Sequence, residues 1–189
     1  MFQSHVNSVI DPIAGSDIFD NHRPTAGVLL VTSDRKGVLL AHHVNAPAHA
    51  YIPIQQEIRQ GETLLNVTYR AIREQVPGVR VDMNSLQFLG DCVNEMPIER
   101  GDLKDKWFFW VVAPCMSFST KQLGEELDEL VLVYSPEQLE DMLRFGTVRR
   151  KKREMIVAAV NEAYALGMLS WRCITAVIPN ESKLEHAVL

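Results

Sequence analysis

Residues 51–79, YIPIQQEIRQGETLLNVTYRAIREQVPGV, concentrate charged and amide side chains around a single predicted helix. The residues that could do chemistry here are Arg70, Glu74 and Gln75, with Glu62 a little upstream. Carboxylate oxygens are preferred ligands of hard divalent cations, and a guanidinium can pair with a carboxylate and orient it. The stretch is therefore a metal site, the remains of one, or a solvated helix face.

The helix that positions these side chains is predicted from the spacing of its apolar residues. The pattern begins at Glu62, and Pro77–Gly78 ends it. Arg70, Glu74 and Gln75 fall largely on the polar side, and the residues before Glu62, including VNAPAHAYIP, are predicted to form a loop. The apolar positions follow the i, i+3, i+4, i+7 spacing of one buried stripe: Leu64, Leu65, Val67, Ala71, Ile72 and Val76.

The elements around this helix indicate an α/β fold with a mixed sheet and helices on both faces. Strands and helices alternate without a strict βαβ period, which argues against a doubly wound parallel sheet. We expect the Gly at the end of SDRKG to supply the positive φ that closes a hairpin. Strands are predicted at 24–32, 37–43, within 79–93, at 105–114 and at 129–134, and helices at 135–146, with a Ser135–Gln138 capping box, and at about 148–166.

The segment resembles the Nudix box, G-x5-E-x7-R-E-U-x-E-E-x-G-U, where U is a bulky aliphatic residue. The likeness extends over residues 24–145, through the AGVLLV strand and the run DELVLVYSPEQLEDML. Glu62, Arg70, Ile72 and Glu74 match the box, Gln56, Ala71 and Gln75 replace its Gly and two of its Glu residues, and Gly78 and Val79 match after an insertion at Pro77.

The resemblance implies a Nudix-like α/β/α sandwich and a divergent hydrolase that cleaves a diphosphate linkage in a nucleoside-diphosphate-type ligand. In the family, glutamates on one helix face hold Mg²⁺ or Mn²⁺, which neutralises the diphosphate and activates water. Positions 71, 74 and 75 share such a face. Only Glu74 keeps a carboxylate, because Ala71 cannot bind a cation and Gln75 offers a neutral oxygen. The alternative is a catalytically inactive Nudix-fold protein that binds or senses a nucleotide or RNA, and a purely structural partner protein stays open as well.

The catalytic residues expected from this resemblance are Glu74, Arg70 and Glu129, with Glu74 and Gln75 as metal ligands. Glu129 is chosen because it precedes a strand where many relatives place an additional acid. The simpler alternatives are a solvated acidic loop at 125–129 and a surface ion pair between Arg70 and Glu74.

The residues expected to bind the substrate are His43, Gln56, Glu57 and Trp107. His43 ends the second strand, where a basic residue can face phosphates, and Trp107 could stack on a base. Glu57 could supply a substitute oxygen ligand. Loop histidines and a Trp107–Trp110 run that packs into the core on both sheet faces are the alternatives.

Charge and cysteine content bear on the binding partners and the cellular compartment of the protein. The net charge of −5 gives no general case for nucleic-acid or membrane binding, yet Arg149, Arg150, Lys151, Lys152 and Arg153 are consecutive and could bind nucleic acid or form a solvated helix start. Three separated cysteines indicate reduced thiols in a cytoplasmic protein, and no leader or membrane segment is recognised. A homodimer is common in the superfamily.

We divide the chain into three parts. Residues 1–23 are expected to form an N-terminal extension and 24–146 the Nudix-like domain. Residues 147–189 are expected to form a C-terminal helix and tail packed on the same domain.

Overall fold

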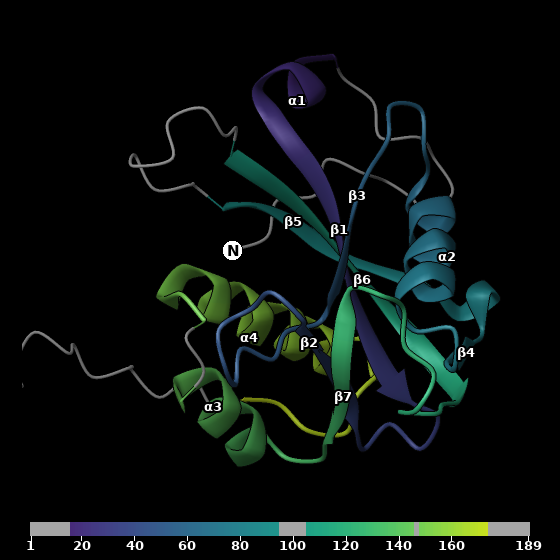
Figure 1. Ribbon diagram of the computed structural model, residues 1–189, viewed down its shortest axis with the longest axis vertical. Coiled ribbons are helices and arrows are strands. Elements are labelled where there is room, and N and C mark those ends of the chain that lie inside the picture. The colour runs from purple at the N-terminus through teal and green to yellow at the C-terminus, as the bar shows by residue number, and fades with distance from the viewer. Residues whose placement is uncertain (1–15, 95–104, 146–147, 174–189) are drawn as a thin grey trace, which may run out of the picture.

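The computed structural model describes residues 16–94, 105–145 and 148–173, drawn as ribbon in Figure 1. The helices are α1 (Ser16–Asn21), α2 (Leu64–Gln75), α3 (Pro136–Phe145) and α4 (Arg150–Ala165), with the 3-10 turn η1 (Met83–Ser85). The strands are β1 (His22–Thr32), β2 (Val38–His43), β3 (Ile54–Glu57), β4 (Arg80–Val81), β5 (Gln87–Asn94), β6 (Asp105–Ser117) and β7 (Leu127–Val133). None of the described helices is both long and apolar enough to cross a membrane.

Within the described residues, the strands form one mixed seven-stranded sheet in the order β4-β6-β1-β2-β7, with β3 on β1 and β5 on β6. Strands β1 and β6 run parallel along their length, from the His22–Asp105 pair to the Thr32–Cys115 pair. The other strand pairs are antiparallel. The predicted mixed sheet is thus confirmed.

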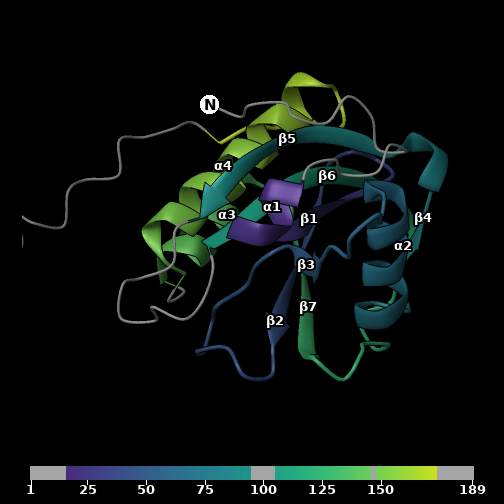
Figure 2. The same ribbon diagram turned by 90° about the horizontal axis from the view of Figure 1, so that it is seen from above.

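The two faces of the sheet carry separate apolar cores. Helix α2 packs on one face, where Val67 and Ala71 belong to the same apolar core as Phe109 and Val111 of β6. Helices α3 and α4 cover the other face, where Ile156 and Trp110 belong to a second core. Figure 2 shows α2 on one side of the strands and α3 and α4 on the other, which makes the predicted three-layer sandwich. The aromatic run of β6 divides between both cores, as the alternation predicts.

Strand β3 corrects the predicted loop before the box helix. Residues 54–57 pair antiparallel with the first half of β1, from Thr25–Glu57 to Val28–Ile54. The sequence IQQE has one apolar residue and no strong strand propensity, so only its distant partner makes it a strand. The position that holds Gly in the box, Gln56, therefore lies in a hydrogen-bonded strand.

The β1–β2 hairpin also differs from the prediction in one detail. The positive φ belongs to Arg35, at 60°, and not to Gly37. A Cβ at Gly37 would lie 2.6 Å from Leu132 Cδ1, so a larger residue there would displace the end of that leucine side chain. Arg35 is held in place because Arg35 O accepts from Ser170 N at 2.8 Å.

Most other boundaries agree within a few residues, and the α3 cap is confirmed. Gln138 N donates to Ser135 Oγ at 3.2 Å, while the Gln138 side chain accepts from Tyr134 N. Strand β1 begins at His22, inside the predicted extension, and helix α1 precedes it. The tail that was expected to pack on the domain lies, from residue 174 on, outside the described residues.

Gly124 closes the C-terminal end of α2, and we predict that Gly124→Ala destabilises the fold. Gly124 N donates to Gln75 O at 2.7 Å, and an added Cβ would lie 1.9 Å from Glu74 O. The backbone must move to relieve this clash, so urea unfolding should show a loss of about 1–3 kcal/mol. The control Gly61→Asn, at φ +77° with no heavy atom within 4 Å of the added Cβ, should lose less than about 1 kcal/mol. Equal losses would contradict the clash.

Candidate functional site

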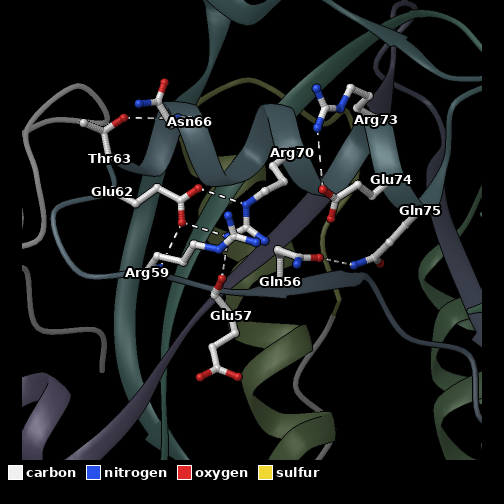
Figure 3. A network of polar contacts seen from close by, with 10 residues as sticks. All are labelled: Gln56, Glu57, Arg59, Glu62, Thr63, Asn66, Arg70, Arg73, Glu74 and Gln75. Atoms are coloured by element: carbon white, nitrogen blue, oxygen red, sulfur yellow. Dashed lines mark hydrogen bonds and ion pairs between the residues drawn. The ribbon is translucent and has the colours of Figure 1, made fainter.

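Arg70 joins the helix, the loop before it and strand β3. Its Nε and Nη2 atoms donate to the two carboxylate oxygens of Glu62 at 3.0 and 2.8 Å. Nη2 also donates to the backbone oxygen of Glu57 at 2.7 Å, as Figure 3 shows. The surface pair with Glu74 is therefore not the contact that Arg70 makes. The side chains of Arg70 and Glu62 are nearly buried, at 11% and 13% exposure, so the pair is a structural cross-link.

The ionisation of Glu62 follows from these contacts. Burial alone would raise the pKa of this carboxyl group, but hydrogen bonds from Arg70 and from the Arg59 backbone N–H outweigh it and lower the pKa. Glu62 is therefore a charged partner of Arg70 at neutral pH. Both of its carboxylate oxygens already accept hydrogen bonds, so its role is to fix the loop.

Gln75 ties the last turn of α2 to strand β3. Its Nε2 amide donates to Gln55 O and to Gln56 Oε1, each at 2.7 Å. The first acceptor is a backbone carbonyl, which fixes the amide orientation because the opposite one would set oxygen against oxygen. Gln75 is 3% exposed. We call the contact among Gln55, Gln56 and Gln75 the amide clasp.

The other two metal-ligand positions of the box, Ala71 and Glu74, lie in different environments. Ala71 is fully buried in the α2-side core. The Glu74 side chain is 44% exposed and approaches Arg73 at 3.6 Å. Among the described residues, no group of three or more His, Cys, Asp or Glu side chains is arranged to hold a metal ion.

Glu129 lies on β7, where its neighbour Leu130 packs in the α2-side core. Because successive strand residues point to opposite faces, the Glu129 side chain lies on the other face, where it accepts from Tyr51 Oη. Glu74 and Glu129 are therefore not brought together. The hydrogen bond to Glu129 raises the pKa of the Tyr51 phenol to about 12.

The residues expected to bind substrate lie on three strands: Gln56 and Glu57 on β3, Trp107 on β6 and His43 on β2. Gln56 belongs to the amide clasp, while the Glu57 carboxylate points away from Arg70 in Figure 3. Trp107 donates to Asp91 Oδ2 at 2.8 Å and stacks on Phe109 at a centroid distance of 6.1 Å. This core contact occupies one of its faces.

His43 is half-buried, and desolvation by burial lowers its pKa. It lines a cavity of about 440 Å³ together with Val44, Asn45, Glu125 and Glu126. The ring of the neighbouring His42 contacts Asp128 at 2.7 Å and Pro47 O at 3.0 Å, and these hydrogen bonds raise its pKa. No local signal marks the contact with Asp128, because the pairing of β2 with β7 creates it.

Comparison with known proteins identifies the architecture. No protein-family model and no curated protein sequence matches the chain. A NUDIX hydrolase from Nitrosomonas europaea superposes with a TM-score of 0.58 at 11% identity, covering 78% of this chain and 91% of that one. The Bacillus subtilis pyrophosphohydrolase BsRppH, in a mutant form, gives a TM-score of 0.58 at 18% identity, covering 82% and 88%. The chain therefore has the Nudix fold.

Removing either side of the Arg70–Glu62 pair should destabilise the protein. We predict that Arg70→Gln and Glu62→Gln each lower the free energy of unfolding by about 2–3 kcal/mol, because a nearly buried charge loses its charged hydrogen-bond partner. The control Arg73→Gln removes an exposed contact on the same helix and should change stability by less than about 0.5 kcal/mol. An Arg70 or Glu62 variant as stable as the control would contradict this role.

The Arg70–Glu62 ion pair should make the free energy of unfolding depend on pH. The folded pKa of Glu62 lies below its ordinary value of 4.5, so the folded state binds fewer protons than the unfolded state as pH falls. The stabilisation is complete above the unfolded pKa and is lost as pH falls through the folded pKa. The stability difference between wild type and Glu62→Gln, measured by urea unfolding, should therefore be constant near neutrality and shrink below about pH 4.5. A difference that persists unchanged in acid would argue against the ion pair.

Proposed function

We propose that this Nudix-fold chain binds a phosphate-bearing, nucleotide-type ligand and that its box helix does not hold the divalent cation used for hydrolysis. The amide clasp carries this proposal. Where the family has a metal-binding glutamate, the chain has the Gln75 amide, and its N–H groups face the oxygens of β3. Gln75 Oε1 has no hydrogen-bond partner among the described residues, and as one neutral oxygen it is a weaker cation ligand than the carboxylate it replaces.

The residues present do not fit the family's three-carboxylate metal site. Hard divalent cations prefer carboxylate oxygens, and Glu74 is the one box position of the three that supplies one. Ala71 contributes a buried methyl group, and Glu62 is committed to Arg70. The amide clasp instead links helix and strand without a metal, so the fold does not need a cation to hold these elements together.

The ligand class rests on likeness. BsRppH is described as a pyrophosphohydrolase, and the Nitrosomonas europaea protein as a NUDIX hydrolase. A Nudix fold that keeps the binding surface and loses the metal would retain affinity for diphosphate groups. The similarity to these two proteins, together with the amide clasp, supports a binding function.

A divergent hydrolase is the second candidate. The exposed Glu74 carboxylate and the likeness to hydrolases favour it. In that case Mg²⁺ or Mn²⁺ would be held by Glu74 with few protein ligands, and the metal would supply charge neutralisation and water activation. The two candidates differ in metal affinity and turnover.

A Mn²⁺ titration followed by electron paramagnetic resonance separates the candidates. Wild type should bind Mn²⁺ with a Kd weaker than about 1 mM, because one exposed carboxylate is a poor site. Gln75→Glu places a second carboxylate beside Glu74 and removes the opposing N–H groups, so it should bind about tenfold more tightly or better. Adding Glu74→Gln to that variant should reverse the gain.

Assays of hydrolysis on wild type and Glu74→Gln test the hydrolase candidate directly. Phosphate release from nucleoside triphosphates, nucleoside diphosphate sugars and dinucleoside polyphosphates with Mg²⁺ or Mn²⁺ should stay at background and should not change in Glu74→Gln. Micromolar Mn²⁺ binding by wild type, with turnover abolished in Glu74→Gln, would overturn the proposal in favour of the hydrolase.

A further inference from the structure

Basic side chains from several elements converge on the sheet face that α4 covers. Lys152 donates from Nζ to Gln55 Oε1 at 3.3 Å, which places the first turn of α4 against β3. Lys106 and Arg149 are near enough to lower the pKa of Lys152, and Arg23 acts on Lys106 in the same way. Register agrees, because Arg23 and Lys106 are paired neighbours on β1 and β6. We call Arg23, Lys106, Arg149 and Lys152 the basic cluster.

The two lysines of the basic cluster are partly buried, and their positive charges repel one another. Burial, and then repulsion from Lys106 and Arg149, lowers the pKa of Lys152 to about 8. Burial is also the main cause of the lowered pKa of Lys106, which lies 5.9 Å from the Phe108 ring centre. Within the described residues, neither lysine forms an ion pair, and Glu57 is the one carboxylate that acts on Lys106. Placing two partly buried lysines close together without a paired carboxylate lowers the stability of the folded protein.

Gln55 adds a second, independent observation. Its Nε2 atom is buried and lacks a hydrogen-bond partner among the described residues. Reversing the amide would turn N–H groups toward the Lys152 ammonium, so this orientation is the favourable one. A buried N–H donor that has no acceptor, next to the positively charged Lys152, favours the binding of an anion.

The N-terminal end of α4 also favours the binding of an anion. Its N-cap residue, Arg149, makes no side-chain capping bond, and the first turn contains no acidic residue. The N-terminal end of a helix carries partial positive charge, so five consecutive basic residues there oppose the macrodipole. A bound anion would stabilise both the helix end and the side chains.

We infer that the basic cluster, with Gln55, is a metal-independent anion site for the diphosphate group of the ligand. It lies on the opposite face of β3 from the amide clasp, because Gln55 faces Lys152 whereas the Gln56 side chain contacts Gln75. The ammonium and guanidinium groups supply the positive charge that a cation would otherwise provide. A diphosphate fits better than a nucleic-acid backbone, since both lysines are half-buried and a chain of phosphates needs an open track. The inference rests on the proposed function for its ligand class.

Calorimetric titration with inorganic pyrophosphate in EDTA at low salt tests the site. Lys152→Met should weaken binding by about tenfold or more, since one charge-assisted contact is lost. The control Lys151→Met removes the same charge from an exposed neighbour and should change affinity less than about threefold. Without pyrophosphate, Lys152→Met should unfold at a higher temperature than wild type, because a disfavoured buried charge is removed.

The outcomes separate this site from its alternatives. Undetectable pyrophosphate binding by wild type, equal affinities in Lys152→Met and wild type, or lost binding in a Lys152→Met protein that is also less stable would overturn the inference. Binding of single-stranded RNA but not of pyrophosphate or ADP, with equal losses in Lys151→Met and Lys152→Met, would assign the basic run to nucleic acid instead. Equal pyrophosphate affinities in wild type and Lys152→Met would overturn this site and leave the proposed binding function standing, whereas undetectable binding of both pyrophosphate and ADP by wild type would overturn both.

Discussion

The guanidinium of Arg70 fixes the geometry on which the rest of this site depends. It binds both carboxylate oxygens of Glu62 and the carbonyl of Glu57, so the connection from β3 to α2 is closed by one nearly buried side chain. A planar guanidinium suits this arrangement because its donors diverge in fixed directions. With the loop held at this end, the far end of α2 meets β3 at one register, and Gln75 lies against Gln55 and Gln56.

Strand β3 then separates two kinds of chemistry by the alternation of its side chains. Gln56 faces α2 and takes part in a neutral amide contact, and Gln55 faces α4 and meets Lys152. In the family that the sequence resembles, charge on the helix side comes from a metal held by glutamates. Here the helix side is neutral where Ala71 and Gln75 replace glutamate, and positive charge gathers on the other side of the same strand.

The sequence predicted the main elements well because their signals are local. The apolar stripe of α2, the cap of α3 and the alternating aromatic residues of β6 each reflect a helix or strand period that needs no distant partner. The resemblance to the box also led us to expect that Arg70 pairs with a carboxylate. Its partner is Glu62, eight positions earlier, because the loop folds back beside the helix.

What the sequence determined by itself was the mixed Nudix architecture, the position of the box helix and the loss of two of its three carboxylates. Tertiary structure alone decided that IQQE is a strand, that Glu129 faces Tyr51 and not Glu74, and that Lys106 lies near Lys152. Each of these depends on strand pairing or helix packing between segments far apart in the chain. Side-chain alternation assigns residues to a face of the sheet only once the strand is paired with its neighbours. No local pattern could therefore predict which charged side chains lie close together.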